Sequence, residues 1–238
     1  TSKIVCGVLV HRWYSCRLRG ERQDMVTRTP RIGAPTREQL LDAAQDAVLA
    51  KGFSGTSIDG LIAAVGISKS GFFYHFRDKS ELAKALLERY VREDDAIFDR
   101  LEAQADALSE DPLHSFLIGL KLLADTFADL PQGHPGCMVA SVCYHEQLFA
   151  REVHEINAAA VLGWRRRFRC RLDAISAVYP ARIAIELDDL ADMVTVVVDG
   201  GIILAKITRD PPSLARQVRL YRDFVRLVFT DPRRRLDM

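Results

Sequence analysis

Residues 56–79 read TSIDGLIAAVGISKSGFFYHFRDK. Apolar residues in the first half of this stretch recur at three- and four-residue spacing, which is typical of one buried helix face. They are Ile58, Leu61, Ile62 and Val65. Gly66 interrupts the pattern, and Ser68 is a favourable N-cap for a second short helix that ends near Phe76. Two short helices joined by a tight turn form a helix-turn-helix, whose second helix can enter the major groove of DNA.

Outward from this stretch the pattern is helical, and no alternating run indicates a strand. Capping-box spacing of Thr36 with Gln39 and of Thr56 with Asp59 predicts the starts of the first two helices, and Asp78 with Glu81 begins a long one. Phe72 and Phe76 are expected in the core. The helices are predicted at 36–51, 56–65, 68–76, 79–107, 113–128, 138–149, 152–178, 181–208 and 213–229. The predicted fold class is therefore all-α.

Residues 37–87 resemble the tetracycline-repressor (TetR) family of regulators. The matching elements are Ala43-Ala44, Gly52-Phe53, Thr56-Ser57-Ile58, Gly66-Ile67-Ser68 and Phe73-Tyr74-His75-Phe76, with Lys79 and Leu82 after them. The family usually has Tyr where this chain has Phe73, and Tyr74 keeps a phenol beside it. The resemblance implies an N-terminal three-helix helix-turn-helix DNA-binding domain, a C-terminal helical ligand-binding and dimerisation domain, and a dimeric repressor that a small effector releases from its operator.

The DNA contacts are expected from small donors, a lysine and polar-tipped rings at the start and outer face of the second short helix, and from the flanking helix ends. The predicted DNA-binding residues are Thr56, Ser57, Ser68, Lys69, Ser70, Gly71, Phe73, Tyr74, His75 and Lys79. Arg28 and Arg31 are a weaker candidate for a minor-groove arm. The predicted partner is double-stranded operator DNA.

Three segments are expected along the chain: a basic, disordered extension over 1–35, the helix-turn-helix domain over 36–80, and the helical domain over 81–238. The overall charge of +1 gives no nucleic-acid signature. Residues 1–35, however, carry seven Lys or Arg against Glu21 and Asp24, a balance typical of an arm along a phosphate backbone or of a solvated tail. Because residues 1–24 show neither helical period nor capping signal, Met25 is expected to be the natural start.

The last two helices are predicted to form a homodimer, since the first of them is unusually apolar and Gly200-Gly201 would let another backbone approach. Its apolar residues are Leu190, Met193, Val194, Val197, Ile202, Leu204 and Ile207. Packing within one chain is the alternative. An apolar pocket with a few polar groups is expected among the middle helices. Its candidate residues are Phe116, Leu120, Phe127, Cys137, Met138, Ser141, Tyr144, His145, Trp164 and Phe168, with Tyr144, His145 and Trp164 placed first. The effector is expected to be hydrophobic.

Other function classes find less support. Five cysteines without a C-x-x-C spacing indicate free thiols in a reducing compartment, and neither a membrane span nor a signal peptide is expected, so a cytoplasmic location is predicted. His145-Glu146 and His154-Glu155 suggest a metal-dependent helical-bundle enzyme, but neither H-E-x-x-H nor repeated Glu-x-x-His occurs. We therefore expect no enzyme, no cofactor and no metal. A regulator that binds no small ligand stays open as an alternative.

The arginine-rich run 165–171 is expected on a solvated or dimer-edge face, and Arg233-Arg234-Arg235 in a frayed tail.

Overall fold

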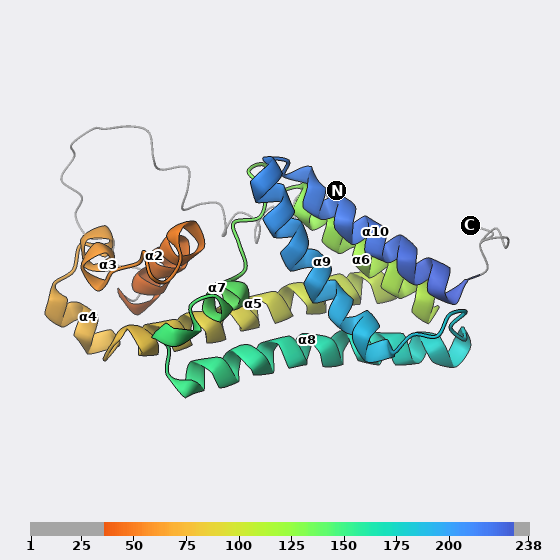
Figure 1. Ribbon diagram of the computed structural model, residues 1–238, viewed down its shortest axis with the longest axis horizontal. Helices are drawn as coiled ribbons and strands as arrows, with labels where there is room; N and C mark the ends of the chain where they lie inside the picture. Colours follow the sequence, from red (N-terminus) through yellow and green to blue (C-terminus); the bar gives the residue numbers. More distant parts are fainter. Residues whose placement is uncertain (1–35, 231–238) are drawn as a thin grey trace. The chain divides into compact units, whose positions relative to one another are not determined.

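The computed structural model describes residues 36–230, apart from the side chain of Glu146, and this part is all-helical with no strand (Figure 1). The helices are α2 (Thr36–Lys51), α3 (Ile58–Val65), α4 (Lys69–His75), α5 (Lys79–Leu108), α6 (Pro112–Ala128), α7 (Met138–Cys143), the 3₁₀ helix η1 (Glu146–Leu148), α8 (Arg151–Val178), α9 (Leu187–Thr208) and α10 (Pro212–Phe229). The predicted basic extension, Met25 start, Arg28–Arg31 arm and arginine tail lie outside the described residues.

Helices α2, α3 and α4 pack around a small apolar core. Phe72 and Phe76, which flank the outward face of α4, are 0% and 1% exposed, as predicted. From α2 come Leu40, Leu41, Ala44 and Val48, all buried. On α3 only Leu61 is buried, while the other apolar residues of that face are partly exposed. Two phenylalanines therefore anchor α4 from beneath.

Side-chain caps fix where these helices begin. Ser68 accepts a hydrogen bond at Oγ from the backbone N–H of Gly71 (3.1 Å), and Asp78 accepts one from Glu81 (2.8 Å), as expected. The cap of α3 is Ser57, which accepts from Gly60 (3.1 Å), and the prediction of Thr56 was wrong. Thr56 is buried and its hydroxyl instead donates to the carbonyl of Gly52 (2.9 Å). Gly66 ends α3 in the left-handed conformation, at φ 76°.

The long helix α5 is joined to α2 by a buried arginine. Arg89 is 8% exposed and donates to Asp42 Oδ1 (2.8 Å), Gln45 Oε1 (2.7 Å) and Glu38 Oε2 (3.4 Å). Hydrogen bonds to charged groups are the stronger ones. The guanidinium therefore fixes the position of α2 on the first turns of α5.

The remaining helices share a second core. Helix α10 packs extensively on α6 and α9, and α8 packs on α9 and α5 (Figure 1). One apolar cluster joins four helices through Leu101, Leu123, Ala124, Ile202, Leu214 and Val218. Gly201 lies at the closest approach of α9 to α10, since a Cβ there would lie 2.7 Å from Leu214 Cδ1. The small size of Gly201 therefore allows α9 and α10 to pack closely within one chain. We had expected it to allow the approach of a second chain.

Two predicted helices are shorter in the structure. The segment predicted as one helix over 138–149 is α7 followed by a turn and η1. The predicted start at Ala181 was also wrong, because Arg182 donates its backbone N–H to the carbonyl of Val228 (2.9 Å) in α10. Helix α9 begins only at Leu187, where Asp188 and Asp189 favour a helix N-terminus.

No boundary near residue 80 divides the described helices, which belong to one compact unit beginning at Thr36. The division into 36–80 and 81–238 therefore stays a prediction. Within residues 36–230, no helix is both long enough and apolar enough to pass through a lipid bilayer.

Candidate nucleic-acid interface and interior cavity

Helix α4 presents a polar and aromatic face to solvent. Lys69 and Ser70 are exposed, Phe73 is 45% exposed and Tyr74 is 85% exposed. The Tyr74 ring stands edge-on to the partly exposed ring of His75, with centroids 5.0 Å apart. Since Phe72 and Phe76 bury the opposite face, these side chains are held outward on a rigid support. A charged group, a hydroxyl and two aromatic rings on one short helix can contact phosphates and base edges.

The first turn of α4 is ordered by its serines. Ser68 Oγ lies 2.9 Å from Ser70 Oγ as well as capping Gly71. Ser57 plays the corresponding role at α3 and is exposed. Eight predicted DNA-binding residues thus lie together, at the caps and on the outer faces of the adjacent helices α3 and α4. They are Ser57, Ser68, Lys69, Ser70, Gly71, Phe73, Tyr74 and His75.

The last two predicted DNA-binding residues, Thr56 and Lys79, make hydrogen bonds within the chain. Thr56 is 2% exposed and its hydroxyl is used within the corner after α2. Lys79 donates its ammonium to the carbonyl of Phe53, and burial lowers the pKa of this ammonium. Both side chains therefore stabilise the Gly52–Phe53 corner; Thr56 is buried there, whereas Lys79 is partly exposed and this bond uses one of its three N–H donors.

A small cavity of ≈ 30 Å³ lies between α5, α6 and α8. Its walls are mostly apolar, with two charged groups and one hydroxyl at the edge. The lining residues are Phe98, Leu101, Glu102, Ala105, Ser115, Phe116, Gly119, Leu120, Leu123, Phe168 and Arg171. Phe116, Leu120 and Phe168 were among the ten candidates from the sequence, so the structure brings three of them together here.

The other seven candidates lie elsewhere. Tyr144 is 74% exposed, because α7 ends at Cys143 and the chain leaves the helix there. His145 lies beside the α2 corner, where a Cβ on Gly52 would be 3.2 Å from its ring. Trp164 is 7% exposed, and its indole N–H has no partner among the described residues. Three residues around the start of α7 (Cys137, Met138 and Ser141) form its cap and core, and Phe127 packs on His134 (5.5 Å between centroids).

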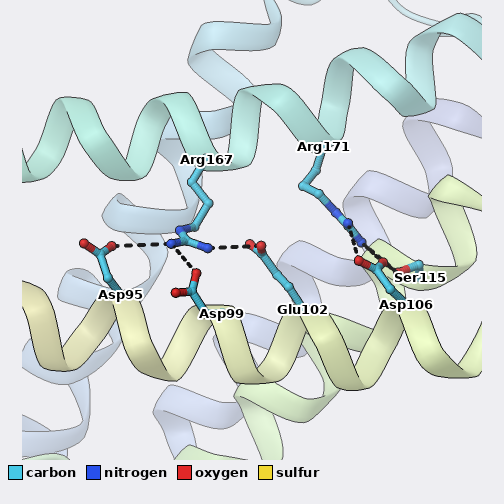
Figure 2. A network of polar contacts seen from close by, with 7 residues as sticks. All are labelled: Asp95, Asp99, Glu102, Asp106, Ser115, Arg167 and Arg171. Atoms are coloured by element: carbon cyan, nitrogen blue, oxygen red, sulfur yellow. Dashed lines mark hydrogen bonds and ion pairs between the residues drawn. The ribbon is translucent and has the colours of Figure 1, made fainter.

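Arginines of α8 form ion pairs with α5 beside the cavity (Figure 2). Arg167 reaches Asp99 (2.7 Å), Glu102 (3.0 Å) and, more distantly, Asp95 (3.7 Å). Four residues further along α8, a second guanidinium holds Asp106 (2.6 and 3.0 Å) and Ser115 (2.7 Å), and it belongs to Arg171. Sequence reasoning missed this network, although the α5 carboxylates recur at helical spacing.

Two other arginines of the 165–171 run, Arg165 and Arg169, contact α9. Arg165 donates to both carboxylate oxygens of Asp192 (2.7 and 2.5 Å), and Arg169 donates to Asp188 (2.7 Å). Both side chains are 37% exposed, so these ion pairs lie on a solvated face, as expected, and the dimer edge stays a prediction. Alternating arginines pair with the carboxylates of two neighbouring helices, because successive residues of a helix face different sides.

Glu102 is the carboxylate of the network that also faces the cavity. Burial raises its pKa, and the nearby guanidiniums of Arg167 and Arg171 oppose this rise. Asp106 behaves differently, since hydrogen bonds from Arg171 and Ser115 lower its pKa. The cavity edge therefore holds the ion pair of Asp106 with Arg171 and a second carboxyl group, Glu102, whose ionised form burial disfavours.

The segment after α7 contacts the corner that follows α2. Phe53 stands edge-on to Phe149, with centroids 4.7 Å apart, and His145 packs beside Gly52. The helix-turn-helix thus contacts the remaining helices through this corner and through Arg89 on α5, among other contacts.

Helices α9 and α10 leave apolar side chains exposed. On α9 the exposed apolar residues recur every three or four residues and so share one helix face. Gly200 lies on this face, and a Cβ at this position would have no atom within 4 Å. The exposed residues are Val196, Ile203, Leu204 and Ile207 on α9 and Leu220 and Leu227 on α10. Of the apolar residues predicted for a dimer, Leu190, Val194 and Ile202 are buried within the chain.

Metal ligands do not gather in the described part of the chain: no three His, Cys, Asp or Glu side chains between residues 36 and 230 are arranged to hold an ion.

Comparison with known proteins finds a family match over the first helices. Residues 40–86 match the family model of bacterial regulatory proteins, tetR family. Over 133 residues the chain is 27% identical to the probable HTH-type transcriptional regulator ArpR of Pseudomonas putida, a match that spans 56% of this chain and 60% of that relative. It is 24% identical to the transcriptional regulator AcuR of Cereibacter sphaeroides, over 84% of this chain and 94% of that protein.

Solved structures show the same fold. The regulatory protein TetR from Rhodobacter sphaeroides superposes with a TM-score of 0.64 at 22% identity, over 80% of this chain and 98% of that one. This likeness concerns the arrangement of helices.

Proposed function

The chain belongs to the TetR family of bacterial regulatory proteins, and from this premise we propose that it is a DNA-binding transcriptional regulator that reads its operator with α4. The observation that carries the proposal is the two-sided character of this helix. Phe72 and Phe76 are buried, whereas Tyr74 is 85% exposed beside exposed Lys69 and Phe73. Large aromatic side chains held together in solvent by a rigid base are typical of a surface that contacts a partner.

We propose that the regulator is a homodimer joined through α9 and α10. A palindromic operator requires two recognition helices about one helical turn of DNA apart, which a two-fold axis supplies. The exposed row of Val196, Gly200, Ile203 and Ile207 on α9, with Leu220 and Leu227 on α10, supports this assignment. Isologous pairing would cover this apolar surface.

A small effector would release the protein from DNA by binding the cavity between α5, α6 and α8. Support comes from position: α5 lines the cavity at Phe98–Ala105 and holds the DNA-binding helices at Arg89. A ligand that favours one orientation of α5 shifts the population between DNA-binding states. Repression is proposed rather than activation, and the protein would act in the cytoplasm, where bacterial DNA lies. The relatives it matches are regulators, and we propose no enzymatic activity.

Selection of bound DNA from a random pool tests the proposal. The full chain should enrich an approximately palindromic site, and affinity should fall steeply with salt because lysine and arginine displace counterions from phosphates. Lys69→Ala and Tyr74→Ala should each weaken binding by roughly tenfold.

Matched controls are Lys121→Ala and Tyr144→Ala, because these residues are an exposed lysine and an exposed tyrosine far along the chain from α4. Both should leave DNA binding unchanged. Full affinity in Lys69→Ala and Tyr74→Ala would contradict the assignment of α4 as the recognition helix.

A further inference from the structure

The cavity between α5, α6 and α8 indicates the chemistry of the effector, an inference that rests on the proposed function. Three phenylalanines and four aliphatic residues form its apolar walls, and the ring of Phe168 stands edge-on to Phe98 (5.5 Å between centroids) and to Phe116 (6.4 Å). Gly119 keeps the opposite wall thin, since a Cβ there would meet only Ala105, at 3.8 Å. Such walls suit a small flat hydrocarbon group.

Two of the three polar groups at the edge are already occupied. Arg171 donates to both oxygens of Asp106 and to Ser115, and the Ser115 hydroxyl itself donates to Asp106 (Figure 2). A bidentate pair of this kind is strong and geometrically fixed. An anionic ligand would have to displace Asp106 to reach this guanidinium.

Glu102 is different, because only one of its carboxylate oxygens is used. Oε2 accepts from Arg167 at 3.0 Å, and Oε1 has no hydrogen-bond partner among the described residues. The side chain is 28% exposed and faces the cavity. The cavity edge therefore offers a free acceptor and lacks a free donor of equal strength.

The charge balance points the same way. Four carboxylates, Asp95, Asp99, Glu102 and Asp106, face the two guanidiniums of Arg167 and Arg171 in Figure 2. Arg167 alone is shared by three of them. The network thus has a formal excess of two negative charges; solvent screens the exposed Asp95 and Asp99, and Glu102 is the carboxylate that lines the cavity, where it favours a cation over an anion.

We propose that the effector is a small lipophilic amine, whose apolar ring or short chain enters among Phe98, Phe116 and Phe168 and whose protonated nitrogen donates to Glu102. The space present, ≈ 30 Å³, holds about one water molecule. An entering ring must therefore push α5 away from α6 or α8. In this arrangement the effector cannot bind without displacing α5. A regulator requires such a coupling between effector binding and a change of conformation.

Three probes that differ only in the polar group test this: benzylamine, benzyl alcohol and benzoate, titrated calorimetrically into the full chain at neutral pH. Benzylamine should bind roughly 10- to 100-fold more tightly than benzyl alcohol, the range expected for a charge-assisted hydrogen bond. Benzoate should bind most weakly. Equal binding of amine and alcohol, tightest binding of benzoate, or binding of none of the three would overturn the proposal.

Variants locate the site. Glu102→Gln should abolish the preference for benzylamine while leaving benzyl alcohol binding unchanged. The matched control is Asp99→Asn, because Asp99 pairs with the same Arg167 but does not line the cavity; it should keep the preference. Gly119→Leu should block all three probes by filling the cavity, and Gly119→Ala should weaken them partially. A preference that persists in Glu102→Gln would overturn the assignment.

Measuring operator binding on the same samples separates this inference from the proposed function. A protein that binds selected DNA but none of the probes would retain the proposed function and lose the amine assignment. A protein that binds benzylamine through Glu102 but no DNA would lose the proposed function and keep the assignment.

Discussion

Replacing Arg89 with Met removes the polar connection between α2 and α5 while keeping an apolar stem of similar length. The side chain is 10% exposed and makes two short hydrogen bonds, to Asp42 (2.8 Å) and Gln45 (2.7 Å), and a longer one to Glu38 (3.4 Å). Each hydrogen bond to a charged group contributes about 1.5–3 kcal/mol when buried. Asp42 and Glu38 are themselves 60% and 41% exposed, so water replaces the arginine on their side.

We therefore expect Arg89→Met to lower the free energy of unfolding by about 2 kcal/mol, well below the sum of the three bonds. For a chain of this size the midpoint of thermal unfolding should fall by about 4–8 °C. Chemical denaturation at one fixed protein concentration measures the loss, because the stability of the proposed dimer would depend on concentration. Amide hydrogen exchange should accelerate in α2 more than in α10.

A double-mutant cycle with Asp42→Asn isolates the pair, with an expected coupling of about 1 kcal/mol. A loss below about 0.5 kcal/mol for Arg89→Met, or no coupling with Asp42, would refute the reasoning. The apolar core of α2 would then suffice to hold the DNA-binding helices.

Three further changes test other features. Gly201→Ala places a Cβ 2.7 Å from Leu214 and should cost about 1–3 kcal/mol of stability, whereas Gly200→Ala meets no atom within 4 Å and should be neutral or stabilising within one chain; denaturation of the pair checks this. Gly66→Ala, at φ 76° with nothing nearby, should cost about 1 kcal/mol through backbone strain alone, and Gly66→Asn less, again by denaturation. Burial and the charge of Lys206 lower the pKa of His134 to about 4. Because the unfolded chain takes up this proton at higher pH than the folded one, stability should fall by roughly 2 kcal/mol as pH drops from 6.5 towards 4, and His134→Gln should flatten that part of the pH profile.

Local signals in the sequence predicted the helix-turn-helix well. The caps Ser68 and Asp78 and the buried pair Phe72 and Phe76 are confirmed, because each depends on residues within one turn. Thr56 shows the limit of such signals. Both Thr56 and Ser57 suit a cap, and the choice falls on Ser57 since the Thr56 hydroxyl donates to Gly52.

Contacts between distant segments were harder to predict. Tyr144 was expected to contact a ligand because one helix was predicted through 138–149, and its exposure results from the end of α7 at Cys143. Glu102 and Arg171 were missed because their meeting depends on how α5 and α8 pack, which periodicity on either helix does not specify. The same is true of Arg89, whose charge suggests solvent and whose partners lie more than forty residues away.

Helix α5 runs unbroken from just after α4 to Leu108 (Figure 1), and its residues between Phe98 and Ala105 line the cavity. From Glu102 back to Lys79 it extends about 35 Å at 1.5 Å per residue. A tilt of about 5° at the level of Glu102 would move the far end by about 3 Å, by the geometry of a rigid rod. In the proposed regulator, a ring that widens the cavity slightly would thus displace α4 by about a hydrogen-bond length, enough for a weakly deforming ligand to disturb the fit of α4 to DNA.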